Sequence, residues 1–411
     1  MKHTLGVAAV SLALSGAGSA HAEQLKIALI EALSGPAAQT GRMYADPIKM
    51  VIEQVNAKGG FNGQPIVMTE YDNQGSPSVA SDKFKVAVAE GARVLIQSAS
   101  SAVAGQLMED VKRYNARNPG KEVVFWNIGS QAYDLTAEKC QFWFFRVAAN
   151  PMINMKALVA VMKEKGVLGD SVYSINQNYS FGQESERAIK QYVGEAGSKV
   201  VGSTLHDVNK IQDFSPYVAR IKASGAKTVL TSNWANDIIL LMRAANDAGV
   251  GAKFGLSAFD IPGAVASAGP GALGYYFVSL YNLDAPGKGQ NEYLEAFRAK
   301  AGEYPTYMRS QVYWGTQLFA EGLRKVDFKG GNIDGKRLAL AFEESRVETP
   351  MGTWSIRKGD HQGIFPMVVA EVSRDVKYKV DNTDRGFKPV KTIAGEAAAV
   401  PVDAACKMER P

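Results

Sequence analysis

The chain has 411 residues, and its 46 lysines and arginines against 41 aspartates and glutamates give a formal net charge of +5. The basic residues are scattered, and no segment carries a basic stripe interleaved with aromatic side chains, so the composition argues against a nucleic-acid-binding protein. A chain of this length exceeds the size at which one hydrophobic core is usual, and we therefore expect two domains.

The first 22 residues have the features of a secretory signal peptide. Lys2 lies in a short basic start, residues 5–14 form an apolar run, and residues 20–22 read Ala-His-Ala, a small-x-small cleavage pattern. The alternative, a membrane anchor, needs ~20 apolar residues, and this run is shorter. No cysteine lies next to the cleavage point, where a lipid anchor would be attached. We expect a periplasmic protein whose mature chain begins at Glu23.

The chain contains two cysteines, Cys140 and Cys406. In an oxidising compartment such as the periplasm, two thiols on one exported chain predict a single disulfide that ties the C-terminal tail to the body. The alternative is two independent cysteines, one buried and one on a loose tail. The sequence leaves this open because it does not say whether the two Cα atoms approach within ~7 Å.

From residue 25 the chain alternates short β-type runs with amphipathic helical segments, which is the pattern of a parallel sheet covered by helices. The helix predicted over residues 43–55 has Tyr44, Ile48 and Val51 on one face. In chain order, the elements of this first series are strand 25–30, helix 43–55, strand 66–71, helix 78–91, and strands 94–98 and 123–126.

A second series of the same kind starts near residue 150. Its strands are expected at 171–175, 200–205, 228–232, 254–258 and 275–278, and its helices at 184–193, 217–223 and 237–248. Further helices are expected at 292–301, 308–325 and 336–344, and strands at 351–356 and 367–372. The tail from Asp381 is polar and rich in Pro, Gly and Ala, so we expect it to be loosely ordered up to Cys406. Two series predict two doubly wound α/β lobes whose strand ends face each other across a cleft.

Catalytic patterns are absent from the sequence. After residue 22 only His206 and His361 remain as histidines, far apart and without Asp, Glu or Cys at metal-ligand spacing. A zinc site and a Ser-His-Asp triad are therefore not expected. No phosphate-binding or dinucleotide-binding glycine loop is present, so no cofactor is expected either. An exported two-domain enzyme stays as an alternative to a binding protein, one that turnover of a bound ligand would reveal.

Hydroxyl-rich turns follow two strands of the first series. Ala99, Ser100 and Ser101 lead from a strand into a helix, and Gly129 and Ser130 form a second such turn. Hydroxyls and free backbone N–H groups at a helix start suit a carboxylate, because they donate hydrogen bonds and the helix dipole favours negative charge. Ordinary N-capping by Ser100 or Ser101 is the alternative. The repetition of the turn makes the two interpretations equally supported.

Aromatic side chains occupy the equivalent edge of the second series. Tyr179 and Phe181 follow one strand, and Trp234 follows another. Core packing is the commoner role of such residues, but their polar neighbours argue against full burial. Facing the serines, these aromatics would clamp the apolar part of a small acid.

Several motifs resemble those of the leucine/isoleucine/valine-binding class of periplasmic proteins that serve ABC transporters. They are IEALSG at 30–35, VNAKGGFNGQPI at 55–66, YDN at 71–73, NYSFG at 178–182, ARIK at 219–222 and RAA at 243–245. The similarity covers about residues 25–375, and the Gly-Gly-x-x-Gly block with its flanks is specific. It implies a receptor, expected to act as a monomer, that delivers a small ligand to a membrane permease. A periplasmic sensor subunit with the same fold is an alternative.

The resemblance implies the type I periplasmic-binding-protein fold, with two lobes that close around the ligand by hinge motion. Three crossovers join the lobes, near residues 148, 279 and 351. The implied N-terminal lobe comprises 23–148 and 279–351, the C-terminal lobe comprises 149–278 and 352–380, and 381–411 form the tail.

The resemblance also implies residue roles. The ligand's carboxylate is held by the two serine-containing turns, with Phe181 and Trp234 over its side chain. At the position of the family's ammonium-binding acid this chain has Ala258, with Asp260 two residues on. Where the family has an aromatic residue in the first lobe, this chain has Thr40. Tyr44, at the start of the following helix, would take the role of that aromatic residue. The implied ligand is a small hydrophobic carboxylate such as a branched-chain or other amino acid. The departures leave open an aromatic acid or an amide, for which Trp126 and Phe259 would also fit.

Overall fold

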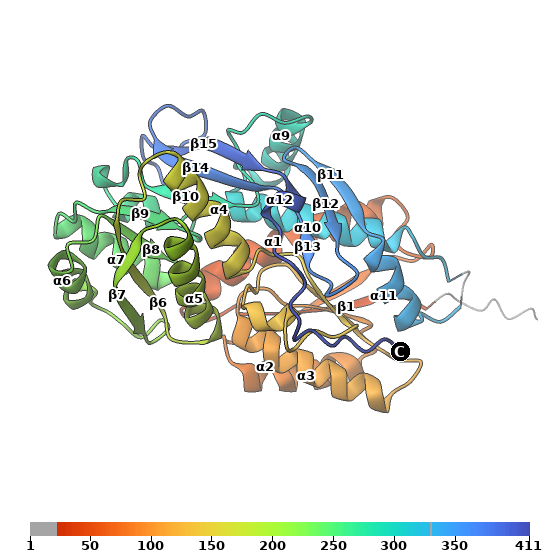
Figure 1. Cartoon of the computed structure of the whole chain (residues 1–411). Coiled ribbons are helices and arrows are strands. Elements are labelled where there is room, and N and C mark those ends of the chain that lie inside the picture. The colour runs from red at the N-terminus through yellow and green to blue at the C-terminus, as the bar shows by residue number, and fades with distance from the viewer. Residues whose placement is uncertain (1–22, 329–330) are drawn as a thin grey trace, which may run out of the picture.

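The computed structural model describes residues 23–328 and 331–411 (Figure 1). The predicted signal peptide at 1–22 lies outside these residues. None of the helices in the described part combines the length and the hydropathy needed to span a bilayer.

The first series forms a five-stranded parallel sheet in the order β2-β1-β3-β4-β5. Its odd and even strand positions face different layers: Ile27 and Leu29 pack with α1, whereas Ala28 and Ile30 pack with α2 and α3. This alternation is the period-2 geometry of a strand covered on both faces. The elements are β1 (Lys26–Glu31), α1 (Ala38–Ala57), β2 (Val67–Asp72), α2 (Pro77–Ala89), β3 (Val94–Ile96), α3 (Ser101–Arg117), β4 (Val124–Asn127), the 3-10 helix η1 (Tyr133–Thr136) and β5 (Phe144–Arg146).

The second series forms a seven-stranded sheet in the order β15-β14-β10-β9-β8-β6-β7. Its strands run parallel except for β14, which is antiparallel to both of its neighbours. The elements are α4 (Pro151–Glu164), β6 (Ser171–Gln177), α5 (Ser180–Glu195), β7 (Lys199–His206), α6 (Ser215–Ala223), β8 (Thr228–Thr231), α7 (Asn236–Asp247), β9 (Lys253–Leu256), α8 (Ala264–Ser267), the 3-10 helix η2 (Pro270–Ala272), β10 (Tyr276–Ser279), β14 (Met367–Ser373) and β15 (Gly386–Ile393). We call the two sheets with their helices the N-terminal and C-terminal lobes.

Between β10 and β14 the chain returns to the N-terminal lobe. Helix α10 packs along α1, and α11 contacts α10 and β4. Strands β11, β12 and β13 form a separate antiparallel sheet, and Gln362 bridges to Arg146 of β5. The elements are α9 (Gln290–Ala301), α10 (Tyr307–Leu323), α11 (Gly335–Glu343), β11 (Arg346–Thr349), β12 (Gly352–Ile356) and β13 (Gly363–Ile364). The chain thus re-enters the seven-stranded sheet only at Met367, later than the third crossover expected near 351.

The expectation of a loose tail after Asp381 is wrong. β15 pairs with β14 from Gly386 to Ile393, and the short helix α12 (Gly395–Ala398) follows. The reason is apolar: the fully buried ring of Phe387 packs against Phe277, Phe259 and Tyr307. Pro389 is tolerated because β15 is an edge strand and its pairing shifts register at that point.

A disulfide anchors the end of this tail. Cys406 is bonded to Cys140, which follows η1 in the N-terminal lobe, with a Cα–Cα distance of 5.4 Å across a sequence separation of 266 residues. In Figure 1 the last segment leaves α12 and ends on the side of α2 and α3. The tail therefore starts in one lobe and is fastened to the other.

We expect Cys406→Ser to lower the free energy of unfolding by about 2–4 kcal/mol, because opening a long covalent loop increases the entropy of the unfolded chain. Thermal melting of the two proteins measures this. Reductant should lower the melting temperature of the wild type to that of the variant and leave the variant unchanged. Equal melting of both proteins without reductant would contradict the prediction.

Candidate ligand-binding site

A cavity lies where the strand ends of the two lobes meet. Its walls come from α1, the turns after β3 and β4, the start of α5, the turns after β8 and β9, and the start of α10. The lining residues are Thr40, Tyr44, Ala99, Ser101, Gly129, Ser130, Gln131, Tyr179, Phe181, Trp234, Ala258, Ile261 and Met308. Eight of the residues predicted from the sequence are among them, and two, Ser100 and Asp260, are not.

Ser100 and Ser101 differ in what they do at the start of α3. Ser100 is the N-cap residue but makes no capping hydrogen bond with its side chain. The Ser101 hydroxyl accepts the backbone N–H groups of Gln131 (3.2 Å) and Ala132 (3.1 Å), which ties the two turns together. Its own hydrogen is thereby left to donate into the cavity. The first intrahelical bond runs from Ala104 to Ser100, so the N–H groups of the first turn have no helical partner.

The second turn is shaped by Asn127. Its Oδ1 accepts the backbone N–H groups of Gly129 (3.2 Å) and Ser130 (2.9 Å), and its Nδ2 donates to the carbonyl of Gln97 (2.6 Å). The Ser130 hydroxyl donates to the carbonyl of Ser98 at 3.0 Å. These bonds leave the Ser130 oxygen as an acceptor in the cavity wall.

Glu31, which the sequence analysis missed, lies beneath the first turn. It ends β1, is fully buried, and accepts the Ala99 N–H at 3.2 and 3.3 Å. Burial raises the pKa of this carboxyl to about 8, and hydrogen bonds from Ala99 and its neighbours only partly offset the effect. An acidic residue at the end of an apolar strand was the available signal. The Ala99 N–H is therefore engaged with the protein's own carboxyl group.

The C-terminal lobe contributes an aromatic wall. Trp234 Nε1 donates to the Tyr179 hydroxyl at 2.8 Å, and the Tyr179 and Phe181 rings lie 5.9 Å apart. Ala235 adopts φ +52°, a left-handed conformation that is costly outside glycine and that turns the chain between Trp234 and α7. Because its oxygen accepts from Trp234, the Tyr179 hydroxyl keeps its hydrogen for the cavity.

Asp260 borders the cavity without lining it. It accepts the N–H of Met308, a lining residue in the first turn of α10. The pKa of Asp260 is raised to about 6, mainly by burial and to a lesser extent by the charge of Asp381. The pKa of Tyr44 is raised mainly by burial of its hydroxyl, and the carboxyl groups of Glu31 and Asp260 raise it as well. No lysine or arginine is among the lining residues.

Two aromatic residues considered from the sequence do not reach the site. Trp126 is fully buried against Phe145, Phe319 and Phe342. Phe259 packs against Phe387 in the C-terminal core. Conversely, Ile261 and Met308 line the cavity and were not predicted, since nothing local distinguishes them. Gln131, the next residue of the predicted turn at Gly129 and Ser130, also lines it.

The two histidines within the described residues, His206 and His361, have structural partners. His206 contacts Asn233 Nδ2 at 2.8 Å, and His361 contacts Glu343 at 2.6 Å and the carbonyl of Phe144 at 3.2 Å. Within residues 23–328 and 331–411 no cluster of His, Cys, Asp and Glu side chains is arranged to hold a metal ion.

Comparison with known proteins decides the family. The family model described as periplasmic binding protein matches residues 24–377. The chain belongs to this family. The predicted type I periplasmic-binding-protein fold and the resemblance to the leucine/isoleucine/valine-binding class are thereby confirmed. The relatives described below are solute-binding proteins.

A similar curated relative is Leu/Ile/Val-binding protein homolog 4 of Brucella abortus (strain 2308), 48% identical over 406 residues, 99% of this chain and 98% of the relative. The leucine-, isoleucine-, valine-, threonine-, and alanine-binding protein of Pseudomonas aeruginosa is 26% identical over 380 residues, 90% of this chain and 95% of that protein.

Among solved structures, the closed conformation of the leucine-, isoleucine-, valine-, threonine-, and alanine-binding protein from Brucella ovis superposes with a TM-score of 0.89 at 47% identity, covering 95% of this chain and 100% of that one. A Rhodopseudomonas palustris solute-binding protein in complex with benzoate has a TM-score of 0.80 at 19% identity, covering 94% and 100%. The second likeness concerns the fold alone.

We expect Gly129→Ala to lower the free energy of unfolding by about 1–3 kcal/mol, since the new methyl would lie 2.5 Å from the buried ring of Tyr44. Gly105→Ala in α3 is the matched control, because its methyl meets no atom closer than 3.8 Å and alanine favours the helix. Denaturant unfolding measures both. A loss of stability in the control equal to that of Gly129→Ala would show that the contact with Tyr44 is not responsible.

Proposed function

We propose that the protein is the solute receptor of an ABC transporter and that it binds a small amino acid with a hydrophobic side chain between its lobes. The observation that carries the proposal is the division of the cavity: donors of the N-terminal lobe on one side and an aromatic wall of the C-terminal lobe on the other. The Ser101 hydroxyl and the first turn of α3 suit a carboxylate. Tyr179, Phe181 and Trp234 suit an apolar body.

The ligand's ammonium group is assigned to the acidic side of the cavity. Asp260, the candidate for this role, lies two residues after Ala258, which lines the wall. Glu31 lies beneath the turn assigned to the carboxylate and takes no part in this assignment. An anion without an ammonium group would add a negative charge near Asp260, with no lysine or arginine among the lining residues. This argument favours an amino acid over an aromatic acid. Two relatives, from Pseudomonas aeruginosa and Brucella ovis, are named as binding leucine, isoleucine, valine, threonine and alanine, which agrees with this argument.

The partner proposed for the loaded receptor is a membrane permease, and we propose that the receptor acts as a monomer in the periplasm after cleavage before Glu23. We also propose that three crossovers divide the chain into the two lobes, near residues 148 and 279 and shortly before Met367, where the chain enters β14. Loss of solute uptake on deletion of the gene tests transport against the sensor alternative.

We expect leucine, isoleucine and valine to raise the melting temperature of the purified protein in proportion to the logarithm of their concentration, because a ligand that binds the folded state stabilises it by mass action. Threonine and alanine complete the amino-acid series, and benzoate and urea represent the aromatic acid and the amide. A shift with benzoate and none with any amino acid would contradict the proposal.

Asp260→Asn tests the ammonium assignment. Asparagine retains an oxygen for the Met308 N–H but removes the charge, so we expect leucine affinity to fall about tenfold, equivalent to about 1.4 kcal/mol. Calorimetric titration measures it. Titration with 4-methylpentanoate, which has the leucine side chain and carboxylate without the ammonium, should show no loss of affinity in the variant and a gain if the Asp260 charge repels the anion. Unchanged leucine affinity in the variant would remove Asp260 from the site.

A further inference from the structure

One face of α5 is turned toward the N-terminal lobe. Phe181, Glu184 and Arg187 are spaced by three residues and lie on that face. Phe181 lines the cavity and packs into the N-terminal core. Glu184 and Arg187 continue the face beyond the cavity. The helix that carries part of the candidate site therefore also carries contacts made only when the two lobes meet.

Glu184 bonds directly to the opposite lobe. Its two carboxyl oxygens accept the first two backbone N–H groups of η1, those of Tyr133 and of Asp134, the latter at 3.1 Å. The guanidinium of Arg187 lies 5.4 Å from the centre of the Tyr133 ring. In α4, Asn154 Nδ2 donates to Gln131 Oε1 at 2.8 Å, so a second helix of the same lobe reaches the same segment.

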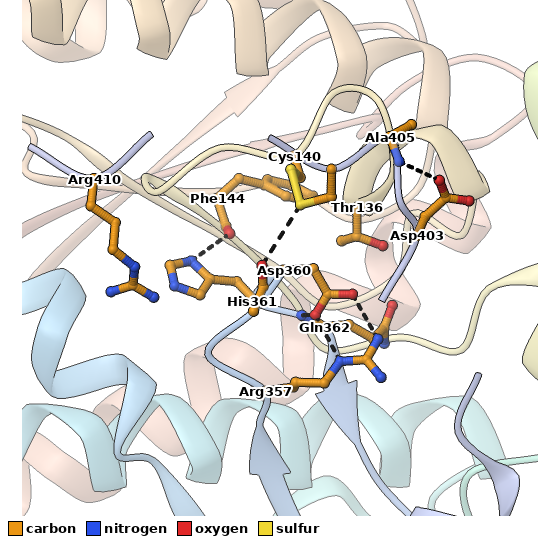
Figure 2. Close-up of a disulfide and its surroundings, with 12 residues drawn as sticks. Thr136, Cys140, Phe144, Arg357, Asp360, His361, Gln362, Asp403, Ala405 and Arg410 are labelled. Carbon is orange, nitrogen blue, oxygen red and sulfur yellow. Dashed lines mark hydrogen bonds and ion pairs between the residues drawn. A yellow bond between two sulfur atoms is a disulfide. The ribbon is translucent and has the colours of Figure 1, made fainter. Parts of the chain in front are cut away.

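The N-terminal lobe holds η1 firmly in place. The buried guanidinium of Arg146 donates to the carbonyl of Ala132 and the hydroxyl of Thr136, on either side of the segment. The Tyr133 hydroxyl donates to Asp403 in the tail at 2.8 Å. Figure 2 shows the disulfide at Cys140 with Asp403 and Ala405 of the tail beside it. The segment that receives Glu184 is thus fixed from its own lobe and by the tail.

We propose that Glu184 is a positioning residue: by bonding the amides of η1 it holds the lobes closed and raises the affinity for every ligand without touching any of them. The inference rests on the proposed function, because it assumes a ligand that binds between the lobes. The cavity and η1 are directly connected: the Ser101 hydroxyl accepts the N–H groups of Gln131 and Ala132, immediately before η1, and Gln131 itself lines the cavity.

The electrostatics give the contact a pH dependence. The pKa of Glu184 is raised to about 7, mainly by burial and also by the charge of Asp134, which together outweigh the lowering effects of the two N–H groups and Arg146. When the lobes separate, solvent returns the pKa toward 4.5. A group whose pKa is higher in the closed state takes up a proton on closing, so closure is favoured as the pH falls through about 7. The other titratable or charged groups that face it are Tyr133, Lys139, Tyr179, Arg187 and Asp403.

Glu184→Ala tests the proposal, with Glu186→Ala as the matched control. Glu186 lies on the same helix but bonds Lys190 and Ser203 within its own lobe. At pH 7 we expect Glu184→Ala to weaken leucine and valine binding by the same factor, about tenfold, mainly through faster dissociation. The control should bind as the wild type does. Glu184→Gln, whose amide oxygen still accepts N–H bonds, should restore most of the affinity.

Three further measurements separate closure from folding. The unliganded Glu184→Ala protein should melt within a degree or so of the wild type, because the bond belongs to the closed state. The ratio of wild-type to Glu184→Gln affinity should rise from pH 8 to pH 6; other titrating groups cancel in this ratio. The amides of Tyr133 and Asp134 should exchange hydrogen more slowly in the wild type than in Glu184→Ala, by a large factor with ligand bound and by a small factor without it, because unliganded molecules close only transiently.

The outcomes are distinguishable. Three results would each overturn the role of Glu184. They are equal ligand affinities of the wild type and Glu184→Ala, a loss of affinity confined to one ligand, and a fall in the variant's melting temperature that is as large without ligand as with it. If no ligand of the series binds the wild type, the proposed function fails instead. Amide exchange at Tyr133 and Asp134 then judges the contact, and equal exchange in the two proteins overturns it.

Discussion

Arg146 ends β5 with a guanidinium that is fully buried, and its bonds join three parts of the chain. It donates to the carbonyl of Ala132, to the hydroxyl of Thr136 and, at 2.7 Å, to the side chain of Gln362. Burial lowers its pKa to about 10, opposed by nearby acidic groups. A buried cation is tolerated only when its donors are satisfied. The second hydroxyl turn, η1 and the segment before β13 are therefore fixed relative to one another.

The acidic groups around the cavity follow the opposite logic. Glu31 and Asp260 accept hydrogen bonds mainly from backbone N–H groups, and burial raises the pKa of both. A carboxyl group held in this way has electrostatic capacity for a positively charged partner that the protein does not provide. For Asp260, which borders the cavity, this capacity agrees with the ammonium group of the proposed ligand.

The tail shows how covalent and apolar forces cooperate. Phe387 anchors β15 in the C-terminal core, whereas Cys406 is bonded to Cys140 in the N-terminal lobe. Composition alone suggested looseness, because the segment is polar on average. One buried ring and one disulfide outweigh that average, since a few strong attachments suffice to order a strand at a sheet edge.

The sequence by itself determined the two βα series, the strand ends and most cavity residues near them, because alternating apolar periods and turn residues are local signals. It also pointed to Cys140 and Cys406 as a pair. Only the tertiary structure decided that Met308 enters the cavity, that Trp126 is covered by α10 and α11, and that Glu184 reaches η1. Each of these depends on chain segments 50 or more residues apart in sequence, and local periodicity carries no information about which distant segment will pack there.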